Sequence, residues 1–379
     1  MKRGPEVQTA LRAVYVRGGT SRALVFRQED LPAATPPRGC AAWDPIFLAA
    51  IGSPDPNGRQ LDGLGGGISS LSKVAVVGPP SRPDADVDYT FAQVAVTEPI
   101  VSYRGNCGNI SSAFGPYAVD EGLVTVSGDE AVVRIHNTNT AKVIEARFPL
   151  RGGRPAVAGS LAIAGVAGTG APIRLAFRDP GGAATGRLLP TGRAREPLPL
   201  AGGCAVDASL IDAANPVVFV LAAALGLTAT ETPDALGSTV LLARFEEIRI
   251  AAAVAMGIAS ESEARSTMKN MPLVALVAPP PDPSLADVTV RVISSGLPHR
   301  AVPLTAAMCL AIAAHVPGSV VAEVIAPGSA DGRDLRVAHA SGVLHVAATV
   351  RANGAGVVAE EAVVYRTARR LMQGEVLIP

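Results

Sequence analysis

The chain has 379 residues, a length that suits two medium-sized domains better than one large one. Hydrophobic residues make up 48% of it, which is ample for packed cores. The 33 basic residues balance the 33 acidic ones, and neither sign forms a long run. This argues against nucleic-acid binding, because nucleic-acid-binding domains normally carry a basic patch or stripe.

Segments that would direct the chain to a membrane are not expected. No apolar region follows residues 1–5, so we predict no secretory signal peptide. The longest apolar runs, such as residues 217–227, are well short of a membrane span. We therefore expect a cytoplasmic protein with no membrane partner.

Short β-rich runs separated by turn residues dominate the chain, and three helical patterns interrupt them. The strands predicted in the first half are residues 13–16, 73–77, 88–96, 131–136 and 143–148. Those predicted in the second half are residues 239–242, 248–254, 273–277, 288–293 and 357–365. The predicted helices are residues 110–121, 217–225 and 304–314. Many strands with few helices predict an α+β fold rather than alternating β–α–β units.

Two stretches of the chain resemble each other. Residues 74–80 (VAVVGPP) are followed by Asp86, a strand, a glycine-rich turn and a helix. Residues 274–280 (VALVAPP) are followed by Asp287 and the same order of elements. This predicts two similar domains, 1–186 and 187–379, with the final segment able to pack back on the first. Because small ligands favour domain interfaces, we expect the active site in the cleft between them.

Cys107 is the strongest candidate for chemistry. It lies in a glycine-rich turn, residues 105–109 (GNCGN), just before a predicted helix. Unpaired backbone N–H groups and the positive end of a helix favour a thiolate there. Gly108 allows close approach of a ligand, and the side chains of Asn106 and Asn109 can bond to carboxylates. The alternative is a buried structural thiol in a tight turn.

Lys73 ends a second glycine-rich segment, residues 62–73 (DGLGGGISSLSK). It is one of four lysines in a chain with 33 cationic residues, so arginine is the default cation. Lysine can lose its proton when buried and arginine in practice cannot, which suggests proton transfer by Lys73. The alternative is a solvated cation at a strand end. The segment lacks the sequence context of a nucleotide-binding loop. Its candidate carboxylate-binding residues are Gly66, Gly67, Ser69 and Ser70.

Residues 17–22 (RGGTSR) offer two guanidinium groups and two hydroxyls within one short segment. Arginine can bind carboxylates in a bidentate manner, so this segment is a candidate clamp, with a surface hairpin turn as the alternative. The candidate ligand-binding residues here are Arg17, Thr20, Ser21 and Arg22. In the second half, the candidates lie in a turn and just before a predicted helix: Ser294, Ser295 and His299.

Metal and cofactor chemistry are not indicated. The five histidines show no HxH or HExxH spacing, and the four cysteines form no CxxC pair. We therefore expect no metal site, no disulfide framework and no organic cofactor.

Taken together, these motifs resemble the 2-methylaconitate cis–trans isomerase (PrpF) family, with its 4-oxalomesaconate tautomerase and methylitaconate isomerase relatives. The resemblance runs nearly end to end. The matching segments are 17–21 (RGGTS), 52–55 (GSPD), 60–67 (QLDGLGGG), 72–74 (SKV), 105–109 (GNCGN), 189–192 (LPTG), 211–216 (IDAANP), 298–300 (PHR) and 366–370 (RTARR).

The resemblance implies the diaminopimelate epimerase fold, in which strands wrap around a central helix in each of two domains. It also implies that Lys73 and Cys107 form the catalytic pair, one as acid and the other as base. The implied enzyme is a cofactor-independent isomerase or tautomerase. Its implied substrate is a small unsaturated di- or tricarboxylic acid of the aconitate, methylaconitate or oxalomesaconate type.

Two alternatives stay open. A two-base racemase or epimerase needs a second thiol at the equivalent turn of the second half, which we place near residues 294–296, where there is none. A non-catalytic protein that binds organic acids has no need of both Lys73 and Cys107. The sequence does not fix the substrate, the direction of reaction or the oligomeric state, for which a homodimer is one option.

Overall fold

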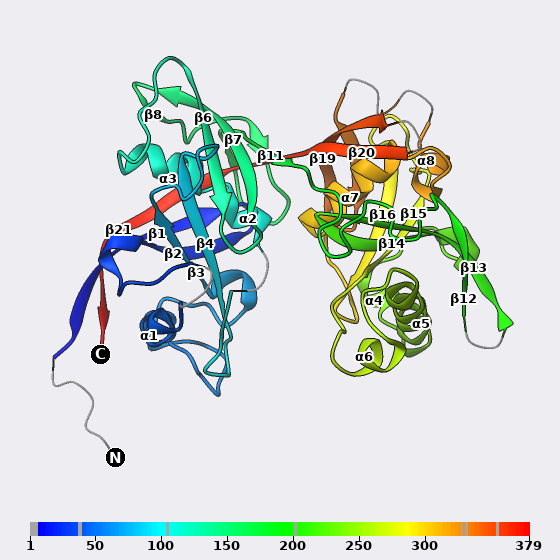
Figure 1. Cartoon of the computed structure of the whole chain (residues 1–379), viewed down its shortest axis with the longest axis horizontal. Coiled ribbons are helices and arrows are strands. Elements are labelled where there is room, and N and C mark those ends of the chain that lie inside the picture. Colours follow the sequence, from blue (N-terminus) through cyan, green and yellow to red (C-terminus); the bar gives the residue numbers. More distant parts are fainter. Residues whose placement is uncertain are drawn as a thin grey trace. The chain divides into compact units, whose positions relative to one another are not determined.

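The computed structural model describes residues 7–36, 40–103, 106–200, 203–326, 329, 333–353 and 356–379. Contacts divide the chain into two units, Met1–Ala176 with Tyr365–Pro379, and Phe177–Val364. The chain leaves the first unit within β11 (Ile173–Arg178) and returns within β20 (Gly356–Arg366) (Figure 1). The first crossing therefore precedes the boundary expected near residue 186.

The first unit is built on strands that pair in the order β21-β1-β2-β3-β4-β6-β7-β8. Their bounds are β1 (Thr9–Gly18), β2 (Ser21–Arg27), β3 (Lys73–Gly78), β4 (Val87–Val94), β5 (Val101–Ser102), β6 (Glu130–Asn137), β7 (Lys142–Arg151), β8 (Arg154–Pro155) and β21 (Ala368–Ile378). A separate two-stranded sheet joins β9 (Leu161–Ala162) and β10 (Thr169–Gly170). The helical segments are η1 (Gln28–Asp30), η2 (Cys40–Trp43), α1 (Asp44–Ile51), η3 (Ser69–Leu71), α2 (Gly108–Ser111) and α3 (Phe114–Asp120).

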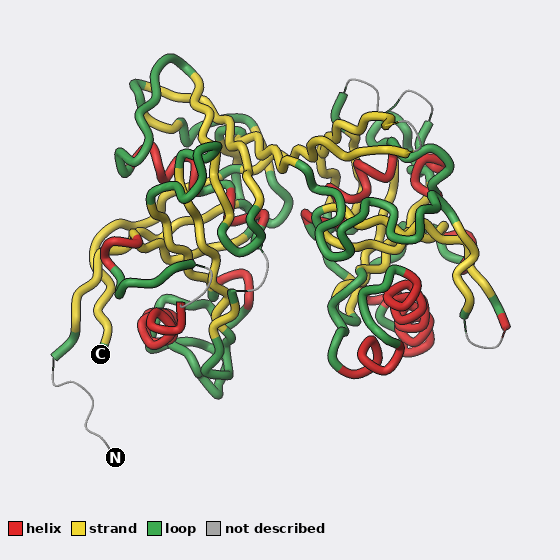
Figure 2. Tube along the Cα trace, viewed as in Figure 1, coloured by secondary structure: helices red, strands yellow, loops and turns green. Residues whose placement is uncertain are grey.

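The second unit has its own strands, drawn in yellow in Figure 2. They pair in the order β12-β13-β14-β15-β16-β18-β19-β20. Their bounds are β12 (Glu196–Pro199), β13 (Ala205–Ala213), β14 (Asn215–Leu221), β15 (Leu273–Ala278), β16 (Val288–Ser294), β17 (Leu297–Pro298), β18 (Leu335–His339) and β19 (Gly342–Asn353). The helical segments are η5 (Ala222–Leu225), α4 (Pro233–Leu236), α5 (Thr239–Ala255), α6 (Glu261–Ser266), α7 (Leu304–Ala314) and α8 (Val320–Val324). Most of α7 is buried, in contact with β13, β14 and β19.

The two units repeat one strand topology. In each, an antiparallel hairpin is followed by a parallel step, a second hairpin, a second parallel step and a third hairpin. The repeat extends to side chains. Asp86 accepts hydrogen bonds from the backbone N–H, Nε and Nη2 of Arg134. Asp287 accepts the same three from Arg336 and adds Arg333 as a second partner.

Predicted elements are wrong in three places, each for a local reason. Residues 217–225, predicted as a helix after a proline, form β14 and a 3₁₀ turn, because the run is β-branched and buried. Residues 239–254, predicted as two strands, form the single helix α5. The missed signals were the side chain of Ser238, which accepts a hydrogen bond at the N-cap, and charged pairs spaced three residues apart. The helix predicted at 110–121 is broken into α2 and α3, because Pro116 is tolerated only in a first turn.

The sheet of the first unit has two differently packed faces. In β2, β3 and β4, the even-numbered core residues belong to one hydrophobic cluster around Trp43 and Phe47: Leu24, Phe26, Val74, Val76, Ala92 and Val94. Because side chains alternate along a strand, the odd-numbered residues of these three strands point to the other face. There Tyr89 of β4 stacks on Phe114 of α3, with ring centroids 4.1 Å apart. This second face carries the site described below.

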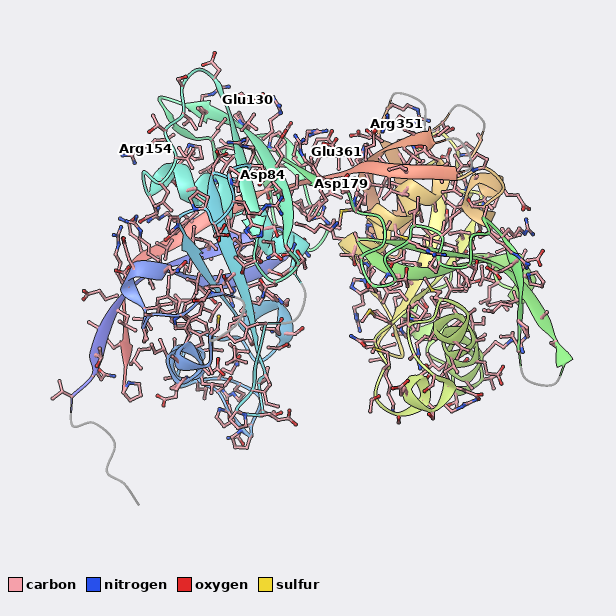
Figure 3. The ribbon with its side chains drawn as sticks, viewed as in Figure 1. Asp84, Glu130, Arg154, Asp179, Arg351 and Glu361 are labelled. Atoms are coloured by element: carbon pink, nitrogen blue, oxygen red, sulfur yellow. The ribbon has the colours of Figure 1, made fainter. Side chains whose placement is uncertain are left out.

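The outer surface carries mixed charges, in keeping with the balanced composition. Glu130 and Arg154 project from the first unit and Arg351 from the second (Figure 3). Exposed pairs such as Arg147–Glu130, at 2.7 Å, and Arg351–Glu360, at 2.8 Å, contribute little to stability. Among the described residues, no helix is long and apolar enough to cross a membrane.

The repeat offers a matched test of stability. Burial would raise the pKa of Asp287, but hydrogen bonds from Arg336 and Arg333 outweigh it and hold that pKa well below its usual range. We predict that Asp287→Asn lowers the free energy of unfolding by about 2 kcal/mol, and Asp86→Asn by about half of that, because Asp86 has one arginine partner. Urea unfolding of both variants at neutral pH measures the difference.

The same substitution has a predicted pH dependence. A carboxylate with a depressed folded pKa contributes stability that is present above the unfolded pKa, about 4, and is lost as the pH falls below it. The gap between wild type and Asp287→Asn should therefore be full at pH 6 and shrink in acid. A gap that widens below pH 4, or equal losses for the two aspartates, would contradict the assignment.

Candidate active site

Lys73 opens β3 and is buried, with 7% of the residue exposed. Its Nζ donates to Oε1 of Gln93, at 2.5 Å, and lies 5.1 Å from the ring centroid of Phe91. Lys73 and Gln93 are directly paired across β3 and β4, so both side chains lie on the odd-numbered face. The ammonium group of Lys73 thus bonds to a neutral amide and lies over an aromatic ring, which attracts a cation.

Gln93 cannot turn its amide over without losing hydrogen bonds. Its Nε2 donates to the carbonyl oxygens of Ser69, at 3.0 Å, and Ser72, at 2.9 Å. These two acceptors require the NH₂ group on that side, so Oε1 is the atom that faces Lys73. The glycine-rich segment is thus tied to Lys73 through one glutamine.

A second glutamine braces the same segment. Gln60 is 1% exposed and accepts hydrogen bonds at Oε1 from the N–H of Gly67, at 2.8 Å, and the hydroxyl of Ser72, at 2.7 Å. Gly66 and Gly67 are half-buried, whereas Ser69 is exposed and Ser70 half-buried. The segment is a braced loop, and the N–H of Gly67 is already used within it.

Cys107 lies at the N-cap of α2 in extended conformation and is half-buried. Its Sγ is 3.8 Å from Oγ of Ser21, a distance at which either group can donate. Asn106 accepts hydrogen bonds from the hydroxyls of Tyr89, at 3.2 Å, and Ser111, at 3.1 Å. Its side chain therefore fixes the turn to β4. Because α2 has only four residues, its dipole contributes less than a long helix would.

The hairpin turn between β1 and β2 packs tightly against the start of α2. A Cβ on Gly18 would lie 2.7 Å from the carbonyl oxygen of Asn109, and one on Gly19 2.4 Å from its Oδ1. Gly19 also has a φ of +51°, which glycine adopts without strain. Two glycines thus let the turn approach α2, and this approach brings Ser21 to Cys107.

Strand register brings Ser21 close to Lys73 as well. Leu24 pairs with Val74 in the parallel β2–β3 ladder, so Ala23 lies beside Lys73. Ser21 precedes Ala23 by two residues along β2. With about 3.3 Å per residue and about 4.8 Å between strands, the Cα atoms of Ser21 and Lys73 are roughly 8 Å apart. Lys73, Ser21 and Cys107 are therefore neighbours on one face of the first unit.

The remaining residues of segment 17–22 differ in their surroundings. Arg17 donates through Nη1 to the carbonyl oxygens of Gly19, at 3.0 Å, and Thr367, at 2.9 Å, so part of its guanidinium holds the turn. Arg22 lies 5.5 Å over the ring of Tyr15. Thr20 is exposed at the tip of the turn.

Three predicted site residues belong to the second unit. Ser294 ends β16 and is half-buried, and Ser295 is exposed in the following turn with a φ of +50°. His299 accepts a hydrogen bond at Nδ1 from the N–H of Ala301, at 3.0 Å, which leaves Nε2 as its donor. Burial lowers the pKa of His299. A role for these three residues stays a prediction.

The repeat corrects the expected counterpart of Cys107. The sequence places it near residues 294–296. In the structure, Ile293 pairs with Val274 as Ala92 pairs with Val74, so the next residue, Ser294, corresponds to Gln93. The N-cap of α7 is Pro303, which therefore corresponds to Cys107. Leu273, the first residue of β15, corresponds to Lys73. The second unit thus has neither a thiol nor an ammonium group at the equivalent positions.

The other cysteines differ from Cys107. Burial raises the pKa of Cys40 to about 11, and burial also raises that of Cys309, which lies within α7. Cys204 is exposed. Within the described ranges, no group of three or more His, Cys, Asp or Glu side chains is arranged to hold a metal ion.

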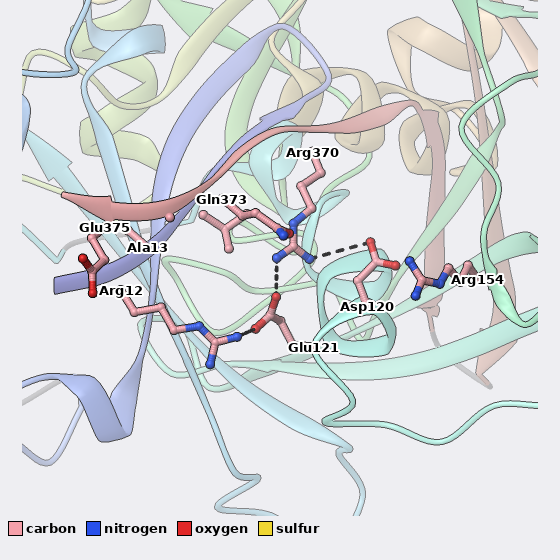
Figure 4. Close-up of a pocket in the computed structure, with 10 residues that line it drawn as sticks. Arg12, Ala13, Asp120, Glu121, Arg154, Arg370, Gln373 and Glu375 are labelled. Carbon is pink, nitrogen blue, oxygen red and sulfur yellow. Dashed lines mark hydrogen bonds and ion pairs between the residues drawn. The ribbon is translucent and has the colours of Figure 1, made fainter.

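A cavity of about 690 Å³ lies elsewhere in the first unit and contains neither Lys73 nor Cys107 (Figure 4). Its charges largely pair with one another: Glu121 accepts from Arg12, at 2.6 Å, and from Arg370. Because the charges that line this cavity are balanced, it presents no cluster of one sign that would bind a polycarboxylate. We therefore assign the chemistry to the face of the sheet that carries Lys73 and Ser21.

Sequence reasoning missed three residues of this site. Gln93 and Phe91 contact Lys73, and Arg366 donates through Nε to Oδ1 of Asn109, at 2.9 Å. Period-2 alternation along β4 could have placed Phe91 and Gln93 on the face of Lys73. Arg366 comes from the far end of the chain, so only its place in the matching segment 366–370 could have indicated it.

Comparisons with known proteins identify the family of the chain. Residues 8–379 match the family model described as PrpF protein. The chain is 39% identical to the 3-methylitaconate isomerase of Eubacterium barkeri, with 98% of each chain covered. It is 36% identical to the 2-methyl-aconitate isomerase of Cupriavidus necator, again with 98% of each covered. It is 41% identical to the (4E)-oxalomesaconate Delta-isomerase of Novosphingobium sp. (strain KA1), with 96% of each covered.

Solved structures point the same way. A crystal structure of methylitaconate-delta-isomerase has a TM-score of 0.88 at 39% identity, covering 98% of this chain and 96% of that one. A hydroxyproline epimerase from Agrobacterium vitis has a TM-score of 0.55 at 12% identity, covering 97% and 92%, and shows the fold alone. The fold is therefore of the epimerase-like type. The chain belongs to the PrpF family, and it is an isomerase.

Proposed function

We propose that the chain catalyses allylic proton transfer on a small unsaturated di- or tricarboxylic acid, with Lys73 and Cys107 as the acid–base pair and without a cofactor. The observation that carries the proposal is the buried ammonium group of Lys73, which bonds to a neutral amide close to Ser21 and Cys107. The names of the relatives support the substrate class, since they act on methylitaconate, methylaconitate and oxalomesaconate.

The chemistry follows from the acidity of the substrate. A C–H bond that is allylic to a C=C bond and conjugated through it to a carboxylate is acidified, because its carbanion is a delocalised dienolate. One group removes this proton, the bonding rearranges or rotates, and the other group returns a proton at a different carbon or face. Positioned proton transfer of this kind contributes roughly 10²–10⁴-fold to the rate. Donors that stabilise the dienolate charge contribute at least as much.

Carboxylate binding is assigned to groups around the pair. The unused N–H groups of Arg17 and Arg22 and the hydroxyls of Thr20 and Ser21 are suited to it, because guanidinium and hydroxyl groups donate to carboxylates. The glycine-rich segments contribute donors through Gly66, Ser69, Ser70, Asn106, Gly108 and Asn109, whereas Gly67, whose N–H donates to Gln60, can contribute only close approach of its backbone. The second unit contributes Ser294, Ser295 and His299. A cytoplasmic location and a homodimer remain part of the proposal.

A two-thiol racemase is the competing reaction, and the repeat argues against it. A racemase of that kind needs a thiol from each unit, whereas Pro303 and Leu273 stand where the second unit would supply its pair. Cys309 is fully buried within α7, with a raised pKa. Chiral analysis of the product separates the reactions. Racemisation inverts a stereocentre and leaves the double bonds in place, whereas allylic transfer moves a double bond.

We predict that Cys107→Ser lowers turnover by about two or more orders of magnitude while the protein stays folded, because a serine hydroxyl stays protonated at neutral pH. The measurement is product formation by NMR with whichever of these acids is turned over. Cys204→Ser is the matched control, since Cys204 is exposed, and it should retain wild-type turnover. A folded Cys107→Ser protein with the wild-type rate removes Cys107 from the mechanism.

We predict that Lys73→Arg also lowers turnover by about two or more orders of magnitude, because guanidinium keeps its proton at working pH. Binding of an unreactive polycarboxylate should weaken far less than turnover. Lys73→Met, which removes the charge at similar length, should weaken both. Exposed Lys269→Arg serves as the control for the exchange itself. Near-normal turnover in Lys73→Arg would leave a one-base mechanism.

Removal of metals should leave activity unchanged. We predict full turnover after exhaustive chelation and dialysis, because the proposed proton transfer uses only side chains and backbone donors. Activity that disappears with chelator and returns with a single divalent cation would refute this part of the proposal.

A further inference from the structure

Arg366 is a buried cation beside the proposed acid–base pair. Only 6% of the residue is exposed, and it lies at the end of β20. Its Nε donates to Oδ1 of Asn109, at 2.9 Å, and its Nη1 to the carbonyl oxygen of Tyr365, at 2.8 Å. Both partners are neutral. No carboxylate in the described part of the chain forms an ion pair with Arg366.

An unpaired buried charge is costly, and Arg249 is a buried arginine of this protein that has a carboxylate partner. Arg249 is 4% exposed, but Glu246 bonds to it through both carboxylate oxygens, at 2.7 Å each. Arg249 also donates to three backbone carbonyl oxygens. Arg366 has one backbone acceptor and one amide. Its charge therefore calls for an anion that is not a carboxylate of the described chain.

The packing around Arg366 identifies that anion. A Cβ on Gly19 would lie 3.0 Å from Cδ of Arg366 and 2.4 Å from Oδ1 of Asn109, so these three residues form one packed cluster. Cys107 is two residues before Asn109 in the same turn, and its Sγ contacts Ser21, two residues after Gly19. The two chain segments that hold Arg366 are thus the two that hold the thiol.

Other ionisable groups near the thiol do not compete for this role. Burial raises the pKa of Tyr89 well above its usual value, so the phenol beside Asn106 stays neutral. Arg17 donates through Nη1 to the carbonyl oxygens of Gly19 and Thr367. Lys73 donates to Gln93. Burial lowers the pKa of Arg366 to about 10, so the guanidinium is charged at neutral pH.

We propose that Arg366 is the counter-ion of the Cys107 thiolate and acts as a positioning residue that holds this thiol ionised before substrate binds. The proton lost on ionisation passes to solvent, and no other reactant is needed. The inference rests on the proposed function and deepens it, because it makes Cys107 the base and leaves Lys73 as the acid in the direction that starts from the thiolate.

The test is the pH dependence of Cys107 alkylation, which does not use turnover. The parent protein carries Cys204→Ser, because Cys204 is exposed, whereas Cys40 and Cys309 are buried. Iodoacetamide labelling at Cys107 is followed by peptide mass spectrometry across pH 5–10. We expect the parent midpoint to lie below that of a free cysteine, about 8.5.

Neutral replacements of Arg366 should raise that midpoint. Loss of a nearby opposite charge shifts a pKa by about one unit or more, so Arg366→Gln and Arg366→Met should both titrate higher than the parent. Arg366→Lys retains the charge and should stay closer to the parent. Arg369→Gln is the matched control, because it removes an exposed arginine three residues along the chain and should leave the midpoint unchanged.

Two results would overturn the proposal. One is an unchanged midpoint in a folded Arg366→Gln or Arg366→Met protein. The other is a parent midpoint at or above that of a free cysteine, which decides the question even if both neutral variants fail to fold. Either result leaves the acid–base role of Cys107 to be judged separately by the turnover of Cys107→Ser, so the two failures are distinguishable.

Discussion

The proposed chemistry depends on two buried cations that are held by neutral groups. Lys73 bonds to an amide and lies over an aromatic ring, and Arg366 bonds to an amide and a backbone carbonyl. A carboxylate partner would stabilise each charge but would also compete with a carboxylate substrate and with a thiolate. Neutral partners orient the cations and leave most of their charge for the ligand and for Cys107.

This arrangement is made by backbone geometry rather than by a single motif. The parallel β2–β3 ladder sets Ala23 beside Lys73 and Ser21 two residues before Ala23, and the glycines at 18 and 19 let the preceding turn approach the start of α2. Larger residues at either glycine would clash with Asn109 and separate Ser21 from Cys107. The repeated topology of the second unit shows what the same framework contains without this chemistry, since Leu273 and Pro303 occupy the corresponding positions.

Most of the predicted strands and the predicted helix α7 are confirmed, because their alternation and boundaries are local signals, whereas long strands such as β13, β19 and β21 were not predicted. The sequence made Cys107 and Lys73 candidates from residue type and turn composition, and their pairing as acid and base came from the family resemblance. It could not place Arg366 near Cys107, since 258 residues separate them and only the return of the chain into the first unit joins them. It misjudged α5 and β14, where short apolar runs fit either structure. It also placed the counterpart of Cys107 wrongly, because the correct position follows from strand register together with the N-cap of α7.

The central claim is that this site moves a proton on an unsaturated polycarboxylate without a cofactor. The most direct measurement incubates the purified, chelator-treated protein in D₂O with aconitate, methylaconitate, oxalomesaconate and methylitaconate in turn, and follows each by NMR. The account predicts deuterium at an allylic carbon of at least one acid, together with a shifted or isomerised double bond. Folded protein that leaves all four acids unlabelled and unchanged would contradict it.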